Sequence, residues 1–140
     1  MRAVLDPNVL ISALLSPGGA RAQIVSRWLA GEFELVVSEQ LLAELERAFG
    51  YPKLSRRIPA SAATDFVELL RGGAIRAADR PITTSRSPDP GDEYLVGLAE
   101  AERAVLVSGD RHLFGLAGQL PICDAAHFLE MVGHSGDPAV

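Results

Sequence analysis

The chain contains a single cysteine, Cys123, among its 140 residues, so no disulfide bond can form within it. Proteins without disulfides are typical of a reducing compartment, and we expect this one in the cytoplasm. No apolar run approaches the roughly 18 residues that a membrane-spanning helix needs, so no contact with a membrane is expected. A secretory signal is not expected either, because Asp6 interrupts the apolar stretch near the start.

Positive charge is also scarce, with 13 Lys and Arg against 18 Asp and Glu and a formal net charge of −5. This balance argues against a protein that binds nucleic acid through bulk positive charge alone. Lys53 is the one lysine, however, and the other basic residues are arginines, whose forked guanidinium groups suit phosphate. The net charge therefore does not decide whether the protein binds nucleic acid.

Short apolar runs alternate with longer helical patterns, which predicts parallel strands connected by helices. Strands are predicted at residues 2–5, 34–37, 74–78, 104–108 and 121–123, and helices at 9–15, 20–30, 39–49, 60–71, 93–101, 111–117 and 125–132. We therefore expect an α/β protein, a three-layer α/β/α sandwich around a parallel sheet of four to five strands in the order 3-2-1-4-5. Residues 1–132 would form one domain, and the polar residues 133–140 a tail.

Polar side chains follow several of the predicted strands. Asp6 follows the first strand, Ser38 the second and Asp110 the fourth. In an open parallel sheet, ligands bind at the carboxyl ends of the strands where the strand order reverses. Because the first and fourth strands are neighbours across that reversal, we expect Asp6 and Asp110 to face one crevice. Asp6 would then be displayed at the edge of the sheet and not buried.

A plainer interpretation of these residues is helix capping. Ser38, Asp92 and Asp124 stand directly before predicted helices, and Asp110 could do so too, where a side-chain oxygen accepts bonds from free helix amides. We assign Asp124 to that role. Asp6 fits it less well, because Pro7 and Asn8 follow and asparagine is itself a good cap.

Carboxylates that converge on one crevice repel each other unless a cation holds them. Their hard oxygen atoms suit Mg²⁺ or Mn²⁺. No His or Cys pair has the spacing of a zinc site, since His112, His127 and His134 are isolated. Carboxylate sites with divalent ions catalyse phosphodiester hydrolysis, which makes a nuclease a candidate.

Four stretches, in order and over nearly the whole chain, together resemble the PIN-domain family: DPNVLISA at 6–13, SEQLLAEL at 38–45, PDPGDEYL at 88–95 and LVSGDRHL at 106–113. The branch they resemble is that of bacterial stand-alone PIN proteins, akin to the toxins of VapBC-type toxin–antitoxin modules. The resemblance implies an Mg²⁺- or Mn²⁺-dependent endoribonuclease with one or two ions, an RNA substrate, a small antitoxin partner and a homodimer.

The resemblance places the acidic metal ligands of the family on Asp6, Glu44, Asp92 and Asp110. Periodicity alone leaves Glu44 and Glu46 equivalent, because they flank opposite sides of the apolar stripe of the same predicted helix. The motif of the family selects Glu44.

Residues beside the acids are interpreted as supports. Asn8 is kept from the first motif of the family, whereas Pro7 stands where the family usually has Thr or Ser. Ser108 could orient Asp110 or a metal-bound water, or it could simply end a strand. Candidate RNA contacts are Lys53, Arg56, Arg57 and Arg111, although such clusters often form only a solvated face.

Other functions were weighed against a ribonuclease. The loss of a hydroxyl at Pro7 leaves open a catalytically inactive PIN-like module that binds RNA or protein. Phosphoryl transfer on an aspartate would need specific neighbours that are missing, since Asn8 stands where a phosphatase of that type carries a second acid. A P-loop nucleotide hydrolase is excluded by the absence of a Gly-rich Walker motif.

Overall fold

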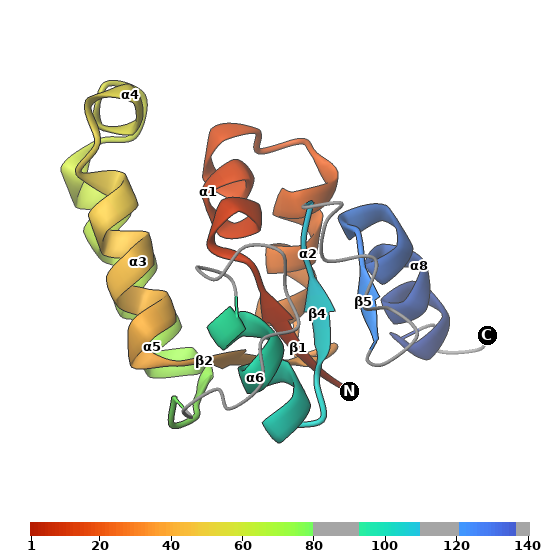
Figure 1. The fold of residues 1–140 in the computed structure, drawn as a ribbon. Coiled ribbons are helices and arrows are strands. Elements are labelled where there is room, and N and C mark those ends of the chain that lie inside the picture. The colour runs from red at the N-terminus through yellow and green to blue at the C-terminus, as the bar shows by residue number, and fades with distance from the viewer. Residues whose placement is uncertain (80–92, 110–120, 137–140) are drawn as a thin grey trace.

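The computed structural model describes residues 1–79, 93–109 and 121–136 (Figure 1). One parallel sheet contains β1 (Arg2–Leu5), β2 (Glu34–Val37), β3 (Ile75–Arg76), β4 (Val105–Val107) and β5 (Ile122–Cys123). The helices are α1 (Pro7–Leu15), α2 (Ala20–Leu29), α3 (Glu39–Phe49), α4 (Pro52–Ser55), α5 (Ala60–Gly73), α6 (Glu93–Ala101) and α8 (Ala125–Gly136). The strand order β3-β2-β1-β4-β5 confirms the predicted sheet.

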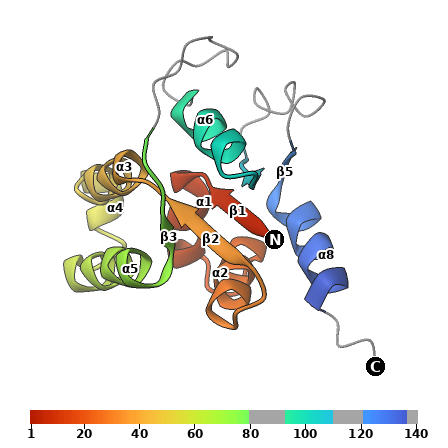
Figure 2. The same ribbon diagram turned by 90° about the horizontal axis from the view of Figure 1, so that it is seen from below.

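Helices cover both faces of this sheet. Figure 2 shows α6 on one face and α1 and α2 on the other, with α3 and α5 lying together beside β3. After β5, α8 packs against α2. The predicted three-layer arrangement is confirmed.

After their first residues, Arg2 and Glu34, the strands β1 and β2 are apolar and buried, because both faces of the sheet are covered. In β1, Ala3, Val4 and Leu5 are all fully buried. β1 pairs with β2 on one side and with β4 on the other, and Leu5 lies opposite Val107. This register brings the ends of β1 and β4 together, so the residues after each strand start at the same edge of the sheet.

Several element boundaries differ from the prediction. The third strand shortens to β3 and the fourth to β4, while α8 continues four residues beyond the predicted end of its helix. The single-turn helix α4 was not predicted, because four residues are too short to show a helical period. The helix predicted at 111–117 lies outside the described residues.

Within the described ranges, no helix has the length and apolar character needed to cross a membrane.

Candidate functional site

Asp6 is the residue that the structure places most firmly at the carboxyl edge of the sheet. Its backbone N–H donates to the carbonyl oxygen of Val107 at 3.0 Å, which extends the pairing of β1 with β4 by one step. Its carboxylate accepts a hydrogen bond from the backbone N–H of Asn8 at Oδ1 (2.9 Å) and one from Ser108 Oγ at Oδ2 (2.8 Å). Both carboxylate oxygens are therefore held in fixed directions.

Two sequence predictions about Asp6 are wrong. Its side chain is buried, with only 5% exposure, whereas we expected it to be displayed at the edge. It is also the N-cap of α1, because proline favours the first helical position and moves the helix start to Pro7. Asn8 therefore lies inside the helix. Capping and site formation are not alternatives here, since one oxygen caps the helix while the other meets Ser108.

Ser108 has a different partner from those considered in the sequence. It is fully buried directly after β4, and its hydroxyl reaches across to the end of β1. The hydroxyl that the first motif lacks at Pro7 is thus supplied to Asp6 from 102 residues further along the chain. The structure brings Asp6, Asn8 and Ser108 together, as expected of supporting residues.

A cavity of about 320 Å³ opens beside Asp6. Its lining comes from the start of α1, from α2 and from the residue that follows Ser108: Asp6, Asn8, Val9, Ser12, Arg21 and Gly109. A buried carboxylate at the wall of a polar cavity, at the switch point of a parallel sheet, has the location expected of a ligand-binding group.

Glu44 and Glu46, which the helical period could not separate, have different surroundings. The hydroxyl of Tyr94, on α6, donates to Glu44 Oε2, so Glu44 is turned toward α6. Glu46 instead accepts from Arg71 Nη2 on α5 at 3.0 Å. Arg71 also pairs with Glu39, and its two glutamate partners hold the pKa of its guanidinium above the usual value. The two glutamates thus face different elements, Glu44 toward α6 and Glu46 toward α5.

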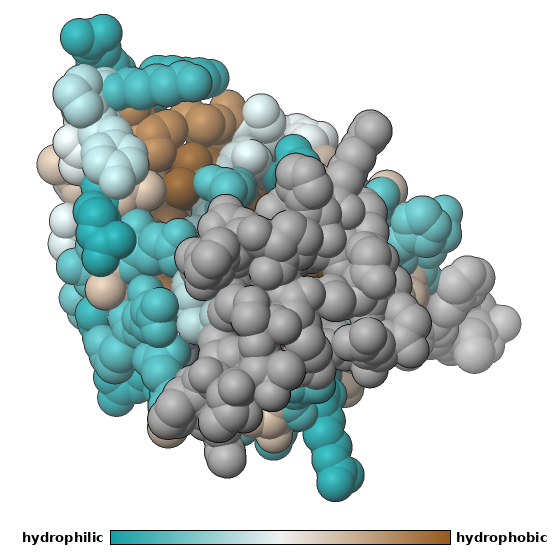
Figure 3. Space-filling view, viewed as in Figure 1, coloured by the Kyte–Doolittle hydropathy of each residue, from teal (hydrophilic) through white to brown (hydrophobic). Residues whose placement is uncertain are grey.

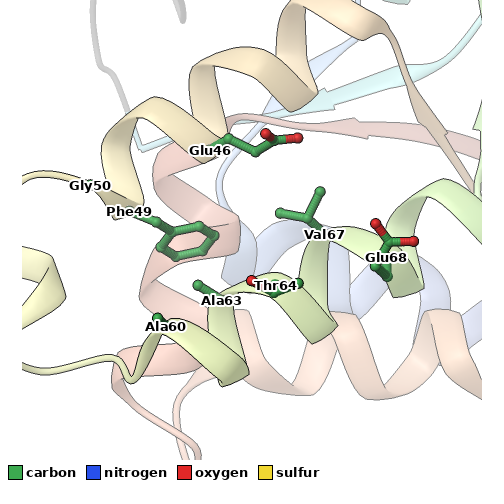
Figure 4. A pocket seen from close by; sticks show the side chains of 8 residues that line it. All are labelled: Glu46, Phe49, Gly50, Ala60, Ala63, Thr64, Val67 and Glu68. Atoms are coloured by element: carbon green, nitrogen blue, oxygen red, sulfur yellow. The ribbon is translucent and has the colours of Figure 1, made fainter.

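Figure 4 shows where Glu46 lies. It stands at a cavity of about 310 Å³ between α3 and α5, across from Glu68 and above the apolar side chains of Phe49 and Val67. No residue of this cavity lines the cavity beside Asp6. Glu46 therefore belongs to the packing of two helices.

Two of the predicted acids, Asp92 and Asp110, and the basic residue Arg111 lie outside the described residues. Of their described neighbours, Gly109 lines the cavity of Asp6, and Tyr94 donates a hydrogen bond to Glu44. Among the residues that the structure describes, no three acidic, His or Cys side chains gather closely enough to hold a metal ion. The joint placement of the four acids thus remains a prediction.

Of the predicted RNA contacts that are described, one lies at a cavity near the site. Arg57 lines a second cavity of about 490 Å³, which shares Ser12 and Arg21 with the cavity beside Asp6. Lys53 and Arg56 are exposed on and after α4 and line neither cavity.

The second cavity also contains one acid, Asp124, at the start of α8. Asp124 accepts from the backbone N–H and from the ring Nδ1 of His127, both at 2.9 Å, which confirms its predicted capping role. These bonds lower the pKa of Asp124, and the side-chain bond to Asp124 raises the pKa of His127. Its negative charge is thus engaged with the helix and with His127.

Sequence reasoning missed two residues of this region. Tyr94, which lies two residues after Asp92 and donates a hydrogen bond to Glu44, has no role assigned to it from the sequence. Arg21 carries no motif. Its place beside the site depends on the packing of α2 near Gly109, where an added Cβ would stand 3.1 Å from Arg21 Nη2.

Asp6 meets the chemical requirement of a divalent-ion ligand. Each carboxylate oxygen carries two lone pairs, and the bonds from Asn8 and Ser108 occupy one on each oxygen. Acceptor capacity therefore remains on a side chain that lines a polar cavity. Hard oxygen donors held by outer hydrogen bonds are the ligands that Mg²⁺ and Mn²⁺ favour.

The surface beside α1 and α3 is apolar. Figure 3 shows a hydrophobic hollow between the region of α3 and α4 and the region of α1, framed by hydrophilic residues. These helices carry partly buried hydrophobic side chains on the edge of the core: Leu14, Leu15, Ala48 and Leu54. An apolar hollow of this kind is typical of a site for a protein partner.

Comparisons with known proteins agree with this architecture. The family model described as PIN domain matches residues 2–112, a range that includes all four predicted acids. A search of curated proteins gives no match.

Solved structures with a similar fold include PAE2754 from Pyrobaculum aerophilum, with a TM-score of 0.67 and 18% identity over 96% of this chain and 90% of that one. VapBC-1 from nontypeable Haemophilus influenzae has a TM-score of 0.60 and 22% identity over 90% and 99%. VapBC2 from Rickettsia felis, bound to a DNA fragment from its promoter, has a TM-score of 0.62 and 14% identity over 89% and 98%. At these identities, the likeness shows a shared fold.

Proposed function

This chain belongs to the PIN domain family, and from that premise we propose that it is a cytoplasmic, Mg²⁺- or Mn²⁺-dependent endoribonuclease. One observation carries the proposal. The buried carboxylate of Asp6, held by Ser108 and the Asn8 amide, lines a polar cavity at the carboxyl edge of the sheet. A fixed acid in such a place suits the binding of a hard cation beside a phosphodiester.

The division of roles follows the motifs of the family, and the described contacts of Asp6 and Glu44 support it. Asp6, Glu44, Asp92 and Asp110 would hold one or two ions, which would supply an activated water and neutralise charge on the phosphate. Ser108 fixes the direction of one Asp6 oxygen, and Tyr94 fixes that of Glu44. Because these donors are rigid side chains of packed elements, the acids are oriented before substrate arrives.

An inactive PIN-like module that binds RNA or protein without cutting is the alternative. The sequence feature that favoured this alternative is Pro7, which lacks the hydroxyl that the family usually has at that position. In the structure, Pro7 occupies the first position of α1, where a proline costs no hydrogen bond, and Ser108 donates to Asp6. The support of Asp6 is thus intact, which favours the enzyme.

We further infer that the protein is the toxin of a toxin–antitoxin pair. The VapBC structures that share its fold are named for such two-component complexes. The apolar hollow between the regions of α1 and α3 offers surface for a small antitoxin chain. A homodimer is proposed on the same family grounds.

Removal of the metal ion tests the function. Purified protein should cleave RNA with Mg²⁺ or Mn²⁺ present, lose the activity in EDTA and regain it when Mn²⁺ is added in excess. A small protein encoded by a reading frame directly before this gene should inhibit the same cleavage reaction. Light scattering of the purified protein alone measures whether it is a dimer. Cleavage that persists in EDTA would exclude the metal mechanism, and tight RNA binding without any cleavage would establish the inactive module.

The two glutamates of α3 give a matched test of the second ligand. Glu44→Gln should lower the cleavage rate by about 10- to 100-fold, because an amide oxygen without net charge binds a divalent ion weakly. Glu46→Gln removes the same charge two residues away and should change the rate less than about twofold, since Glu46 pairs with Arg71 on α5 and does not line the cavity of Asp6. Single-turnover rates at saturating Mn²⁺ measure both. Equal losses in the two variants would contradict the assignment of Glu44.

A further inference from the structure

The two cavities near Asp6 meet at Arg21. This residue, in the first turn of α2, lines both the cavity that contains Asp6 and the cavity that contains Arg57. Ser12 on α1 is the other residue they share. A chain that leaves the first cavity across these two residues enters the second.

The guanidinium of Arg21 lies against Gly109, the residue that follows Ser108. An added Cβ at Gly109 would stand 3.1 Å from Arg21 Nη2, which is closer than side chains normally pack. A glycine at this position therefore leaves room for the guanidinium beside the site of Asp6. The arrangement puts a positive charge beside the cavity that contains Asp6.

No described acidic side chain forms an ion pair with the guanidinium of Arg21. Arg2, Arg27, Arg71 and Arg76 all pair with glutamates. In the described ranges, the side chains of Arg21 and Arg57 have no hydrogen-bond or ion-pair partner, and they are the described arginines that line the two cavities. The carboxylate of Asp124, in the second cavity, is occupied by His127. The described lining thus presents two arginines that pair with neither Asp6 nor Asp124, and arginine is the side chain best suited to phosphate.

We propose that Arg21 binds a backbone phosphate of RNA next to the scissile one and directs the strand across α2 toward Arg57. The inference rests on the proposed ribonuclease function and adds to it a path for the substrate. Phosphate contacts of this kind set the register of a nucleic acid on a protein without reading its sequence. Arg21 is therefore a substrate-positioning residue, and Lys53 and Arg56 lie off the path.

Salt-dependent binding tests Arg21 separately from catalysis. A fluorescein-labelled single-stranded RNA of 12 nucleotides is titrated with the Asp6→Asn protein, which keeps the RNA intact, and with the same protein carrying Arg21→Gln. Loss of one phosphate contact should weaken binding by about tenfold and reduce the slope of log K against log salt by about 0.7. Arg21→Lys should restore the slope, because it restores the charge.

Arg103→Asn is the matched control. Arg103 is exposed in the turn before β4, at the opposite edge of the sheet, and its φ of 53° is one that asparagine tolerates. Arg103→Asn removes one positive charge, as Arg21→Gln does, and should leave the slope of log K against log salt unchanged. A second measurement uses a set of RNAs in which one phosphate at a time is replaced by a neutral methylphosphonate. Replacement at one position in the RNA should weaken its binding to the Asp6→Asn protein but not to the same protein that also carries Arg21→Gln.

The outcomes separate the two hypotheses. If Arg21→Gln binds RNA with the same affinity and slope as Arg103→Asn, the path is wrong, even where the wild-type protein cleaves RNA. If the parent shows no salt-dependent RNA binding, the path fails together with the RNA substrate. If the slope falls as expected but wild-type protein does not cut RNA with Mn²⁺, Arg21 keeps its role and the nuclease function is overturned.

Discussion

Replacing Asp6 by asparagine should lower the rate of RNA cleavage by more than about 100-fold while leaving the fold nearly as stable as before. Even residues that only orient a metal ligand change activity by about 10- to 100-fold, and a ligand itself should count for more. Asparagine has the same shape and is an equally good N-cap, so its oxygen can still accept from the Asn8 amide. Its amide group can face Ser108, whose hydroxyl can also accept.

Thermal unfolding with and without Mg²⁺ makes the result specific to metal binding. A ligand that binds only the folded state raises its stability, by about 2.7 kcal/mol at a concentration 100 times the Kd. Mg²⁺ should therefore raise the Tm of the wild-type protein and not that of Asp6→Asn. Asp6→Ala is the comparison, because it also removes the cap and should cost about 1 kcal/mol of stability. Full activity in Asp6→Asn would remove the basis of the proposed site.

Replacing Phe128 by alanine should destabilise the protein by about 3–5 kcal/mol, a large part of the 5–15 kcal/mol that keeps a domain folded. Phe128 is fully buried in α8 and meets Phe33 edge to face, with ring centroids 4.9 Å apart and planes at 85°. The family match ends at residue 112. The variant therefore tests whether the segment beyond that residue is part of the same folding unit.

Equilibrium unfolding in urea measures the loss. Phe128→Leu keeps most of the volume and should cost less than about 1.5 kcal/mol. Combination with Phe33→Ala should cost less than the sum of the single variants, by about 0.5–1.5 kcal/mol, because the two rings interact directly. An unchanged midpoint for Phe128→Ala would show that α8 does not stabilise the domain.

Local patterns were sufficient for the order and type of most elements. Buried parallel strands are rich in apolar residues, and β1 and β2 each contain three consecutive apolar residues after one charged residue. Element ends were less predictable, since β3 and β4 are held by only a few paired residues. The start of α1 was misplaced because Asp6 and Asn8 are both good caps, and Pro7 decided between them.

The sequence by itself determined the α/β architecture and the position of Asp6 at the end of a strand, because these depend on the local spacing of apolar and polar residues, and the observed sheet has the order that is common for such an alternation. Only the tertiary structure decided that Ser108 supports Asp6, that Glu44 and not Glu46 meets α6, and that Arg21 lies against Gly109. Each of those contacts joins residues 50 to about 100 positions apart, so it depends on how whole elements pack and leaves no mark in either segment alone.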